Sequence, residues 1–307
     1  MSGPTRRPTS GATKRPTSGA TRRGTAVATD TALGLAARRG PLAALARTAL
    51  YALLVLVFAG PLLALLAGAF SEVTDPTALS LLPTRPTLAN FRAALDRDVL
   101  RYLANSLVVV GGGLLLQIAV SVSAAYALSR RRFPGAQLVL LLILGTMMLP
   151  EEVLAIPLSL VLSDLDLIGT LAGMVLPVGA WAFSILVTAE FMKEIPVELE
   201  EAARLDGAGD LRIFWSVILP LCRPALGVIG IFGFTMIWDQ YLLPMLVATD
   251  ARQFTLPLAL RTLRADEEVG IGVLLASALL ALLPSVLAFL AMQRQFLRGL
   301  TSGAVKG

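Results

Sequence analysis

The sequence predicts an all-α membrane protein that crosses the bilayer six times and has both termini on the cytoplasmic side. Three observations support this fold class. Of the 307 residues, 56% are hydrophobic and only 15% are charged, whereas soluble globular domains carry about 25% charged residues. The apolar residues form long stretches, and a helix needs about 20 of them to cross the hydrocarbon core. The Lys and Arg residues are also divided unevenly between alternate loops.

Six apolar stretches account for the predicted crossings. In the third stretch Glu151 and Glu152 follow Pro150 and interrupt the apolar run, and in the fifth stretch Asp239 lies well inside the apolar residues. The six stretches are Thr48–Phe70, Asn105–Ser129, Ala136–Leu162, Leu167–Ala189, Pro224–Thr249 and Gly270–Met292.

The distribution of basic residues gives the orientation. Of the 26 Lys and Arg residues, 19 fall in the N-terminal tail, in the loops after the second and fourth crossings, and in the C-terminal tail, and the other seven fall in the remaining loops. Because cytoplasmic loops carry the excess of Lys and Arg, both termini and the loop 191–223 are predicted to be cytoplasmic. The net charge of +5 then reflects membrane orientation, and no nucleic-acid partner is predicted.

The composition also excludes several classes of activity. The chain has one cysteine, Cys222, and no histidine, so it has no disulfide framework of its own, no histidine triad and no histidine metal site. It also lacks the glycine-rich phosphate-binding pattern G-x-x-x-x-G-K-[ST], so any ATP hydrolysis must come from another chain. We therefore predict no catalytic residues and no metal or cofactor site in this chain, which is not expected to be an enzyme.

Residues 1–44 are predicted to be a disordered, basic cytoplasmic tail ahead of a transmembrane domain at 45–307. The unit Arg-Pro-Thr-Ser-Gly-Ala-Thr occurs at 7–13 and again at 15–21. The segment has almost no large apolar side chains, so burial cannot offset the entropy lost on ordering. Two alternatives share this composition, an organelle transit peptide and a segment that contacts lipid headgroups.

The cytoplasmic loop after the fourth crossing contains a predicted pair of short helices. Pro196 suits a first helical turn, and the glutamates within 198–201 suit the positive end of the helix dipole. Gly207 and Gly209 are expected to end this helix because glycine adopts positive φ at little cost. Asp210 is expected to cap the next helix, which leads into the fifth crossing. A partner that moved this element would move the fifth helix; the alternative is an amphipathic loop lying on the membrane surface.

This loop resembles the EAA loop of bacterial ABC-importer permeases. The residues that carry the resemblance are Glu201-Ala202-Ala203, then Gly207, then, after nine residues, Val217-x-Leu219-Pro220, although the family prefers isoleucine where Val217 stands. The runs 195–208, 238–244 and 293–307 are similar to the second permease of the maltose-type carbohydrate subfamily, whose members commonly have Asn at the position of Asp239. The resemblance covers about residues 45–307.

The resemblance implies the ABC-importer permease fold and a short coupling helix, around Glu201 to Leu205, that docks in a cleft on a cytoplasmic ATPase. The implied partners are two ATPase subunits, a second, related but non-identical permease subunit, an extracytoplasmic solute-binding protein and membrane lipid. ATP and Mg²⁺ would be bound by the ATPase. The implied location is the bacterial inner membrane, and the implied activity is import of a sugar or sugar-like solute by alternating access. The coupling residues expected are Glu201, Ala202, Ala203, Asp206, Gly207 and Ala208.

Polar residues inside the apolar stretches are the candidates for the solute path. A carboxylate near the bilayer centre costs about 2.5–3.5 kcal/mol on insertion scales, and carboxylates, amides and aromatic faces suit a polyhydroxylated solute. The structural alternatives are a hydrogen-bonding role in the helix bundle for Asp239 and an interfacial position for the two glutamates. The path candidates are Trp238, Asp239, Gln240, Tyr241, Glu151 and Glu152.

Two alternative functions remain at this point. An importer for glycerol phosphate or its diesters fits the 238–244 run, although a phosphate calls for basic partners in the path. A secondary transporter driven by protons or sodium would use Glu151, Glu152 or Asp239 as ion sites, but it leaves the coupling-loop pattern unexplained.

Overall fold

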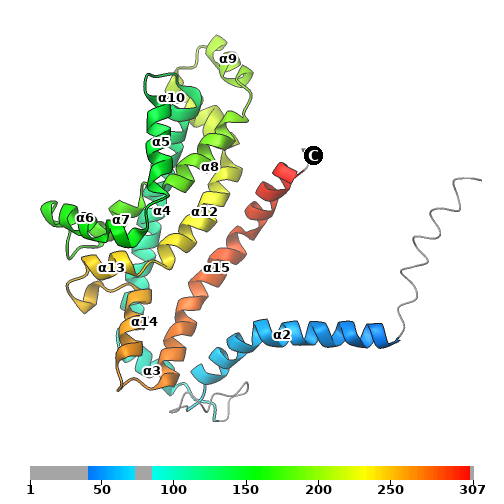
Figure 1. Ribbon diagram of the computed structural model, residues 1–307, viewed down its shortest axis with the longest axis vertical. Helices are drawn as coiled ribbons and strands as arrows, with labels where there is room; N and C mark the ends of the chain where they lie inside the picture. The colour runs from blue at the N-terminus through cyan, green and yellow to red at the C-terminus, as the bar shows by residue number, and fades with distance from the viewer. Residues whose placement is uncertain (1–40, 73–84, 305–307) are drawn as a thin grey trace, which may run out of the picture. The chain divides into compact units, whose positions relative to one another are not determined.

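The computed structural model describes residues 41–72 and 85–304, and this part of the chain is helical (Figure 1). The chain divides into two units, residues 1–59 and 60–307. The described part of the first unit is the N-terminal portion of α2, and the second unit holds every later element. Residues 1–40 of the predicted basic tail lie outside the described residues.

The element order agrees with an all-α fold. The only β interaction in the described residues is a single isolated bridge between Ser71 and Pro86. The helices are α2 (Pro41–Ala69), α3 (Ala89–Asp96), α4 (Val99–Arg130), α5 (Ala136–Thr146), α6 (Glu151–Asp164), α7 (Leu171–Val178), α8 (Ala182–Lys193), α9 (Glu198–Leu205), α10 (Asp210–Ile213), the π-helical segment η2 (Phe214–Ile218), α11 (Leu219–Leu221), α12 (Arg223–Trp238), α13 (Leu242–Val247), the 3₁₀ segment η3 (Ala251–Gln253), α14 (Leu256–Ala265) and α15 (Ile271–Ala304).

Three helices are long and apolar enough to cross a membrane alone, at Arg47–Ala69, Val99–Arg130 and Ile271–Gln293. They correspond to the first, second and sixth predicted crossings. Three further pairs pass the same test only together, because each is bent at a short break: α5 with α6 by 108°, α7 with α8 by 40°, and Asp210–Leu221 with α12 by 70°. The described residues thus contain three spans, or up to six if each bent pair is one span.

The third predicted crossing is not one continuous helix. α5 ends at Thr146 and α6 begins at Glu151, with Pro150 in an extended conformation between them. Pro150 has no N–H to donate to a preceding turn and disfavours helical geometry in the residue before it. The two glutamates then occupy the first turn of α6, where the helix dipole favours negative charge. At 11 residues, α5 is about 16 Å long and is too short to cross alone.

The fifth predicted crossing is also not one continuous helix, and Asp239 lies at the end of its helix and not within it, as had been predicted. α12 ends at Trp238, and Asp239 is the exposed residue that caps its C-terminus. A separate short helix, α13, begins at Leu242. A continuous helix would have placed the ring of Pro244 against the carbonyl of Gln240, one turn earlier. The break instead puts Pro244 in the first turn of α13, where its missing N–H needs no partner.

α4 is the central helix of the packing and contacts α7, α8 and α12. α12 packs in turn against α15. Glycines allow the close approaches, as expected for helices that pack in membranes. A Cβ built on Gly113 would lie 2.7 Å from a Val178 methyl and 3.1 Å from Ile237. On α12, a Cβ on Gly233 would lie 2.2 Å from Oε1 of the buried Gln117.

Candidate functional site

The short helix predicted in the loop 191–223 is present as α9, and its end is well defined. Gly207 has φ of +80°, its N–H donates to the Arg204 carbonyl at 3.0 Å, and the Ala208 N–H donates to the Ala203 carbonyl at 2.9 Å. These two bonds form a Schellman motif, in which glycine supplies the left-handed residue. The prediction for Gly207 is confirmed. Gly209 was expected to act in the same way, but its φ is −73°, so it continues in an ordinary extended conformation.

α9 presents an exposed face and a buried face. Glu201, Ala202 and Asp206 are exposed, as is Gly207, and Leu205 is 90% exposed. The other two predicted coupling residues, Ala203 and Ala208, are partly buried. These two alanines pack against an apolar cluster formed by the C-terminal ends of α4 and α8 and by the segment 213–222. The predicted set therefore divides into residues available to a partner and residues that seat the helix.

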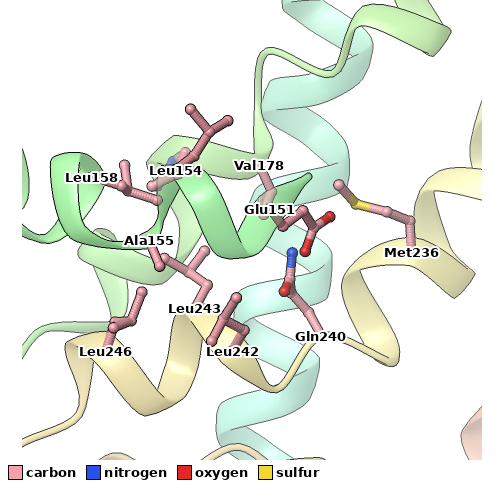
Figure 2. A pocket seen from close by; sticks show the side chains of 11 residues that line it. Glu151, Leu154, Ala155, Leu158, Val178, Met236, Gln240, Leu242, Leu243 and Leu246 are labelled. Atoms are coloured by element: carbon pink, nitrogen blue, oxygen red, sulfur yellow. The ribbon is translucent and has the colours of Figure 1, made fainter. Parts of the chain in front are cut away.

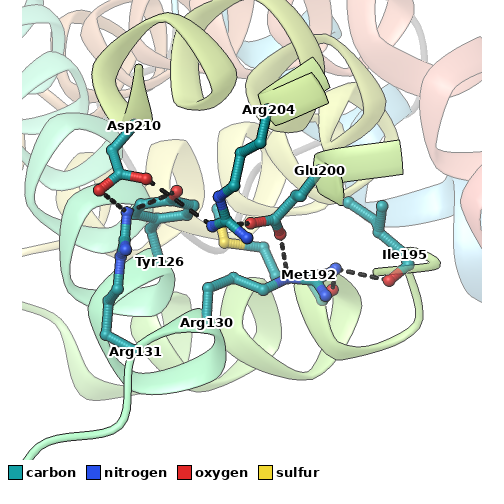
Figure 3. Close-up of polar contacts among 8 residues, drawn as sticks. All are labelled: Tyr126, Arg130, Arg131, Met192, Ile195, Glu200, Arg204 and Asp210. Atoms are coloured by element: carbon teal, nitrogen blue, oxygen red, sulfur yellow. Dashed lines mark hydrogen bonds and ion pairs between the residues drawn. The ribbon is translucent and has the colours of Figure 1, made fainter. Parts of the chain in front are cut away.

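A network of charged side chains joins α9 to the end of α4 (Figure 3). Glu200 on α9 is buried and forms an ion pair with Arg130, the last residue of α4, at 3.2 Å. Arg204 contacts Glu200 at 3.4 Å and Asp210 at 3.7 Å. Arg131 contacts Asp210 at 2.8 Å. This network fixes the exposed face of α9 relative to the membrane helices.

Asp210 does not cap the helix that follows it, as had been predicted. It is the first residue of α10, the preceding Gly209 is the N-cap, and no side chain there makes a capping hydrogen bond. Its carboxylate instead accepts from Arg131, whose guanidinium also lies 5.3 Å from the centre of the Tyr126 ring. The hydrogen bond from Arg131 lowers the pKa of the Asp210 carboxyl, and the same contact raises the pKa of Arg131.

Arg130 and Glu200 were not predicted as members of this site. Arg130 was counted only among the basic residues after the second crossing that set the orientation. Glu200 lies three residues before Ala203 and therefore on the same face of the short helix. That spacing could have indicated that the Glu200 side chain faces inward. No signal in the sequence connects Glu200 with a residue 70 positions earlier.

Five of the six candidates for the solute path lie around the break between α12 and α13. A pocket of about 230 Å³ is lined by Glu151, Glu152, Asp239, Gln240 and Tyr241, together with Met236 and Leu242. The break in α5–α6 and the break in α12–α13 thus bring five of the six predicted path residues together. Glu151 and Asp239 are 88 positions apart in the sequence, and their proximity had not been predicted.

An adjoining pocket of about 150 Å³ shares part of this lining and is mainly apolar (Figure 2). The carboxyl group of Glu151 and the amide of Gln240 point towards one end of it, and leucine side chains line the other end. A solute there would meet polar groups on one side and hydrocarbon on the other, which suits a molecule with hydroxyl groups and an apolar face.

Trp238, the sixth path candidate, lies in the apolar core. It is only 5% exposed, and its ring stacks on Phe234 with 5.5 Å between centroids and 10° between planes. Both side chains also border a third pocket, of about 290 Å³, between α12 and α15. Polar groups from Thr235, Asp239 and Ser285 line the same pocket, so Asp239 faces two pockets at once.

The charges around these pockets are predominantly negative. Three carboxylates, those of Glu151, Glu152 and Asp239, line them, and no Lys or Arg is among the lining residues of the three pockets. Arg261 of α14 lies nearby, with its guanidinium 4.1 Å from the centre of the Tyr241 ring, a cation–π contact that the sequence did not predict. Among the described residues, no group of three or more Asp, Glu, Cys or His side chains could hold a metal ion.

Known proteins share the fold and much of the sequence. Residues 117–301 match the family described as "Binding-protein-dependent transport system inner membrane component". A "Putative ABC transporter permease protein ORF2" of Caldicellulosiruptor sp. (strain Rt8B.4) is 34% identical over 228 residues, which are 74% of this chain and 83% of the relative. The "sn-glycerol-3-phosphate transport system permease protein UgpE" of Yersinia pestis bv. Antiqua (strain Antiqua) is 37% identical over 200 residues, 64% of this chain and 71% of the relative.

A solved structure gives the same architecture. It is the "Crystal structure of a bacterial ABC transporter involved in the import of the acidic polysaccharide alginate", which matches with a TM-score of 0.75 at 24% identity and covers 85% of this chain and 98% of its own. The chain belongs to the family of inner-membrane permease components of binding-protein-dependent ABC importers. It is a multi-pass protein of the cytoplasmic membrane and a transport component, and membership of this family implies an ATPase and a solute-binding protein as partners.

Proposed function

We propose that this chain is one of two non-identical permease subunits of an ABC importer for a neutral, polyhydroxylated solute such as a sugar. In this proposal α9 docks on one of two ATPase subunits, and the six predicted crossings place α9 and both termini in the cytoplasm. The observation that carries the proposal is that α9 is exposed along one face and fastened to the membrane helices by the other. A helix built only for internal packing would not leave Leu205 90% exposed.

The coupling step follows from this arrangement. When ATP and Mg²⁺ bind on the ATPase subunits, those subunits close on each other and each carries a docked α9 with it. Because α9 continues through α10, η2 and α11 into α12, its movement is transmitted to the helix that borders all three pockets. Closure would turn the permease pair from inward-open to outward-open, and hydrolysis on the ATPase would reverse the change.

The pockets at the α12–α13 break support the choice of solute class. Sugar hydroxyls pair well with carboxylate and amide oxygens, and sugar ring faces pack on aromatic and aliphatic side chains. The similarity to permeases named for sn-glycerol-3-phosphate supports an anionic solute as the second candidate. Three carboxylates without a basic lining residue favour the neutral solute, because a phosphate group would be repelled there. An ion-coupled transporter gives α9 no role and disagrees with the family to which the chain belongs.

The experiment that tests the proposal is the identification of the proteins bound to this chain. A tag on the C-terminus, gentle solubilisation in mild detergent and mass spectrometry should recover an ATPase with a phosphate-binding loop and a second permease. The solute-binding protein encoded with them then identifies the solute through its own ligand. If the wild-type chain purifies alone as a stable monomer or dimer, the proposal is wrong.

Two glycines provide a matched pair of variants for the same experiment. Gly207→Asp places a side chain at φ of +80°, whereas Gly209→Asp places the same charge two residues away at an ordinary φ, and a Cβ at either position meets nothing within 4 Å. We expect Gly207→Asp to lose the ATPase and Gly209→Asp to retain it. Equal loss in both variants would indicate that charge, and not the turn geometry, controls docking.

A further inference from the structure

The strongest unassigned feature is the buried guanidinium of Arg130. Its side chain is 6% exposed, and that of its ion-pair partner Glu200 is 3% exposed. The Nη2 group donates to the carbonyl of Met192, in the last turn of α8, and to the carbonyl of Ile195 at 2.6 Å, in the segment leading to α9. One side chain from the end of α4 thus contacts α8, the α8–α9 connection and α9 itself (Figure 3).

The contact with Glu200 differs from the outer charge pairs. Arg130 Nε and Glu200 Oε1 lie 3.2 Å apart, off the line of a good hydrogen bond, and neither atom has a hydrogen bond to another group in the described part of the chain. Charges removed from water persist only when they are paired. Lifting α9 away from α4 would therefore break this pair: Glu200 would keep only Arg204, on its own helix, and the buried Arg130 guanidinium would keep only its carbonyl partners.

The outer pairs cannot supply the same constraint. The side chains of Arg131, Arg204 and Asp210 are 37%, 46% and 57% exposed. Water and salt screen exposed pairs of this kind, and their contribution is small. Among the charged contacts in the described residues, the buried ones of Arg130 therefore constrain the direction of α9 most, beside the apolar packing of Ala203 and Ala208.

We propose that Arg130 is a positioning residue that holds α9, α8 and the end of α4 as one body. The consequence for transport rests on the proposed function: when an ATPase displaces α9, the Arg130 contacts move α4 and α8 with it. The planar guanidinium fits this role because its several N–H groups point in fixed directions to different partners. A residue needed only to fill space would have no reason to carry charge here.

The first test measures the position of α9 and needs no ATPase. The full chain carries two spin labels in a Cys222→Ala background, one at Ser123→Cys, an exposed position on α4, and one at Leu205→Cys on α9. Double electron–electron resonance spectroscopy then measures the distance between the two labels. Wild type should give one narrow distance distribution, and Arg130→Gln should lose that single peak. Arg132→Gln, which removes an exposed charge two residues away, should keep it.

A double variant separates positioning from simple packing. Arg130→Met with Glu200→Met removes both charges and fills the volume with apolar atoms, an exchange that often preserves stability. Its thermal unfolding should be close to that of wild type, but its distance distribution should stay broad because methionine contacts lack direction. A single narrow peak in this double variant, or in Arg130→Gln, would refute the proposal.

The second test follows the transmission in the complex with its ATPase. Thr235→Cys, exposed and lining the pocket between α12 and α15, is labelled with a membrane-impermeant maleimide before and after trapping with Mg-ATP and vanadate. Coupling of this kind should raise the wild-type labelling rate about fivefold or more. In the complex that contains Arg130→Gln, the ATPase should still hydrolyse ATP, but the labelling rate of Thr235→Cys should no longer rise. A full rise in Arg130→Gln would refute the transmission step, whereas a wild-type chain that binds no ATPase would refute the proposed function and leave the distance test to decide the positioning role.

Discussion

Two adjacent glutamates on α9 should have opposite roles, because one side chain is buried and the other is exposed. Glu200 faces Arg130, and Glu201 faces away from the membrane helices. The substitutions Glu200→Gln and Glu201→Gln remove the same charge from neighbouring positions of one helix. We expect the first to lower stability and the second to leave stability unchanged while reducing the amount of ATPase that co-purifies.

The size of the first effect can be worked out from the contacts of Glu200. Removing one partner of a buried ion pair costs about 3–5 kcal/mol when nothing replaces it. Glutamine retains the volume and one oxygen, and Arg130 keeps its bonds to the carbonyls of Met192 and Ile195. The remaining loss is close to that of a single charged hydrogen bond, about 2 kcal/mol. At about 2–4 °C per kcal/mol, the Tm should fall by about 4–8 °C.

The assay is thermal unfolding of the purified chain in detergent, together with quantification of the ATPase recovered with each variant. Glu201→Gln should shift the free energy of unfolding by no more than about 0.5 kcal/mol, as is usual for an exposed position. The reasoning fails if Glu201→Gln destabilises the chain as much as Glu200→Gln. It also fails if Glu201→Gln retains the full amount of ATPase.

Three further outcomes follow from the packing and from the pockets. Gly173→Ala places a Cβ 2.4 Å from the backbone carbonyl of Leu167, and since backbone cannot swing aside, we expect a loss of about 1–3 kcal/mol in thermal unfolding. Gly230→Ala meets the end of the Met292 side chain, with its terminal methyl at 2.2 Å and its sulfur at 3.9 Å, and should cost clearly less in the same assay; equal losses would show that a side-chain neighbour and a backbone neighbour are equally unyielding. Asp239→Asn should reduce uptake of the solute that the partner solute-binding protein carries, without changing the recovery of the ATPase, and unchanged uptake would remove Asp239 from the solute path.

The parts of the fold that the sequence predicts are those with local causes. Long apolar runs predict α2, α4 and α15, and Gly207 predicts the end of α9 because only a left-handed residue completes its turn. The interruption of the third crossing at Pro150 was visible in the sequence, but the break before Pro244 was not predicted, and neither were the bend angles. A bend of 108° between α5 and α6 depends on what each half packs against, and no local pattern encodes that.

The candidate site shows the same division. Five path candidates were chosen one by one, each for its polarity within an apolar stretch, and the structure brings them to one pocket. Trp238 was chosen for the same reason, yet it stacks on Phe234 in the core. Arg130 and Glu200 were missed because a buried ion pair between distant residues is decided by tertiary packing, and each residue alone resembles an ordinary surface charge.

The break between α12 and α13 has a consequence for hydration. Where a helix ends, its last four carbonyl groups lack partners within the helix, and where a helix begins, its first four N–H groups lack them. Both helix ends lie at residues 239–241, next to the pockets, where the carbonyls of Thr235 and Ile237 accept from the N–H groups of Asp239 and Gln240 and the remaining end groups are left for other partners. Water at this point would be held by main-chain acceptors and donors, and an arriving hydroxyl group could exchange with that water at little cost in desolvation. No side-chain substitution removes these backbone groups. Replacing the side chains of residues 239–241 together should therefore weaken solute passage without abolishing it.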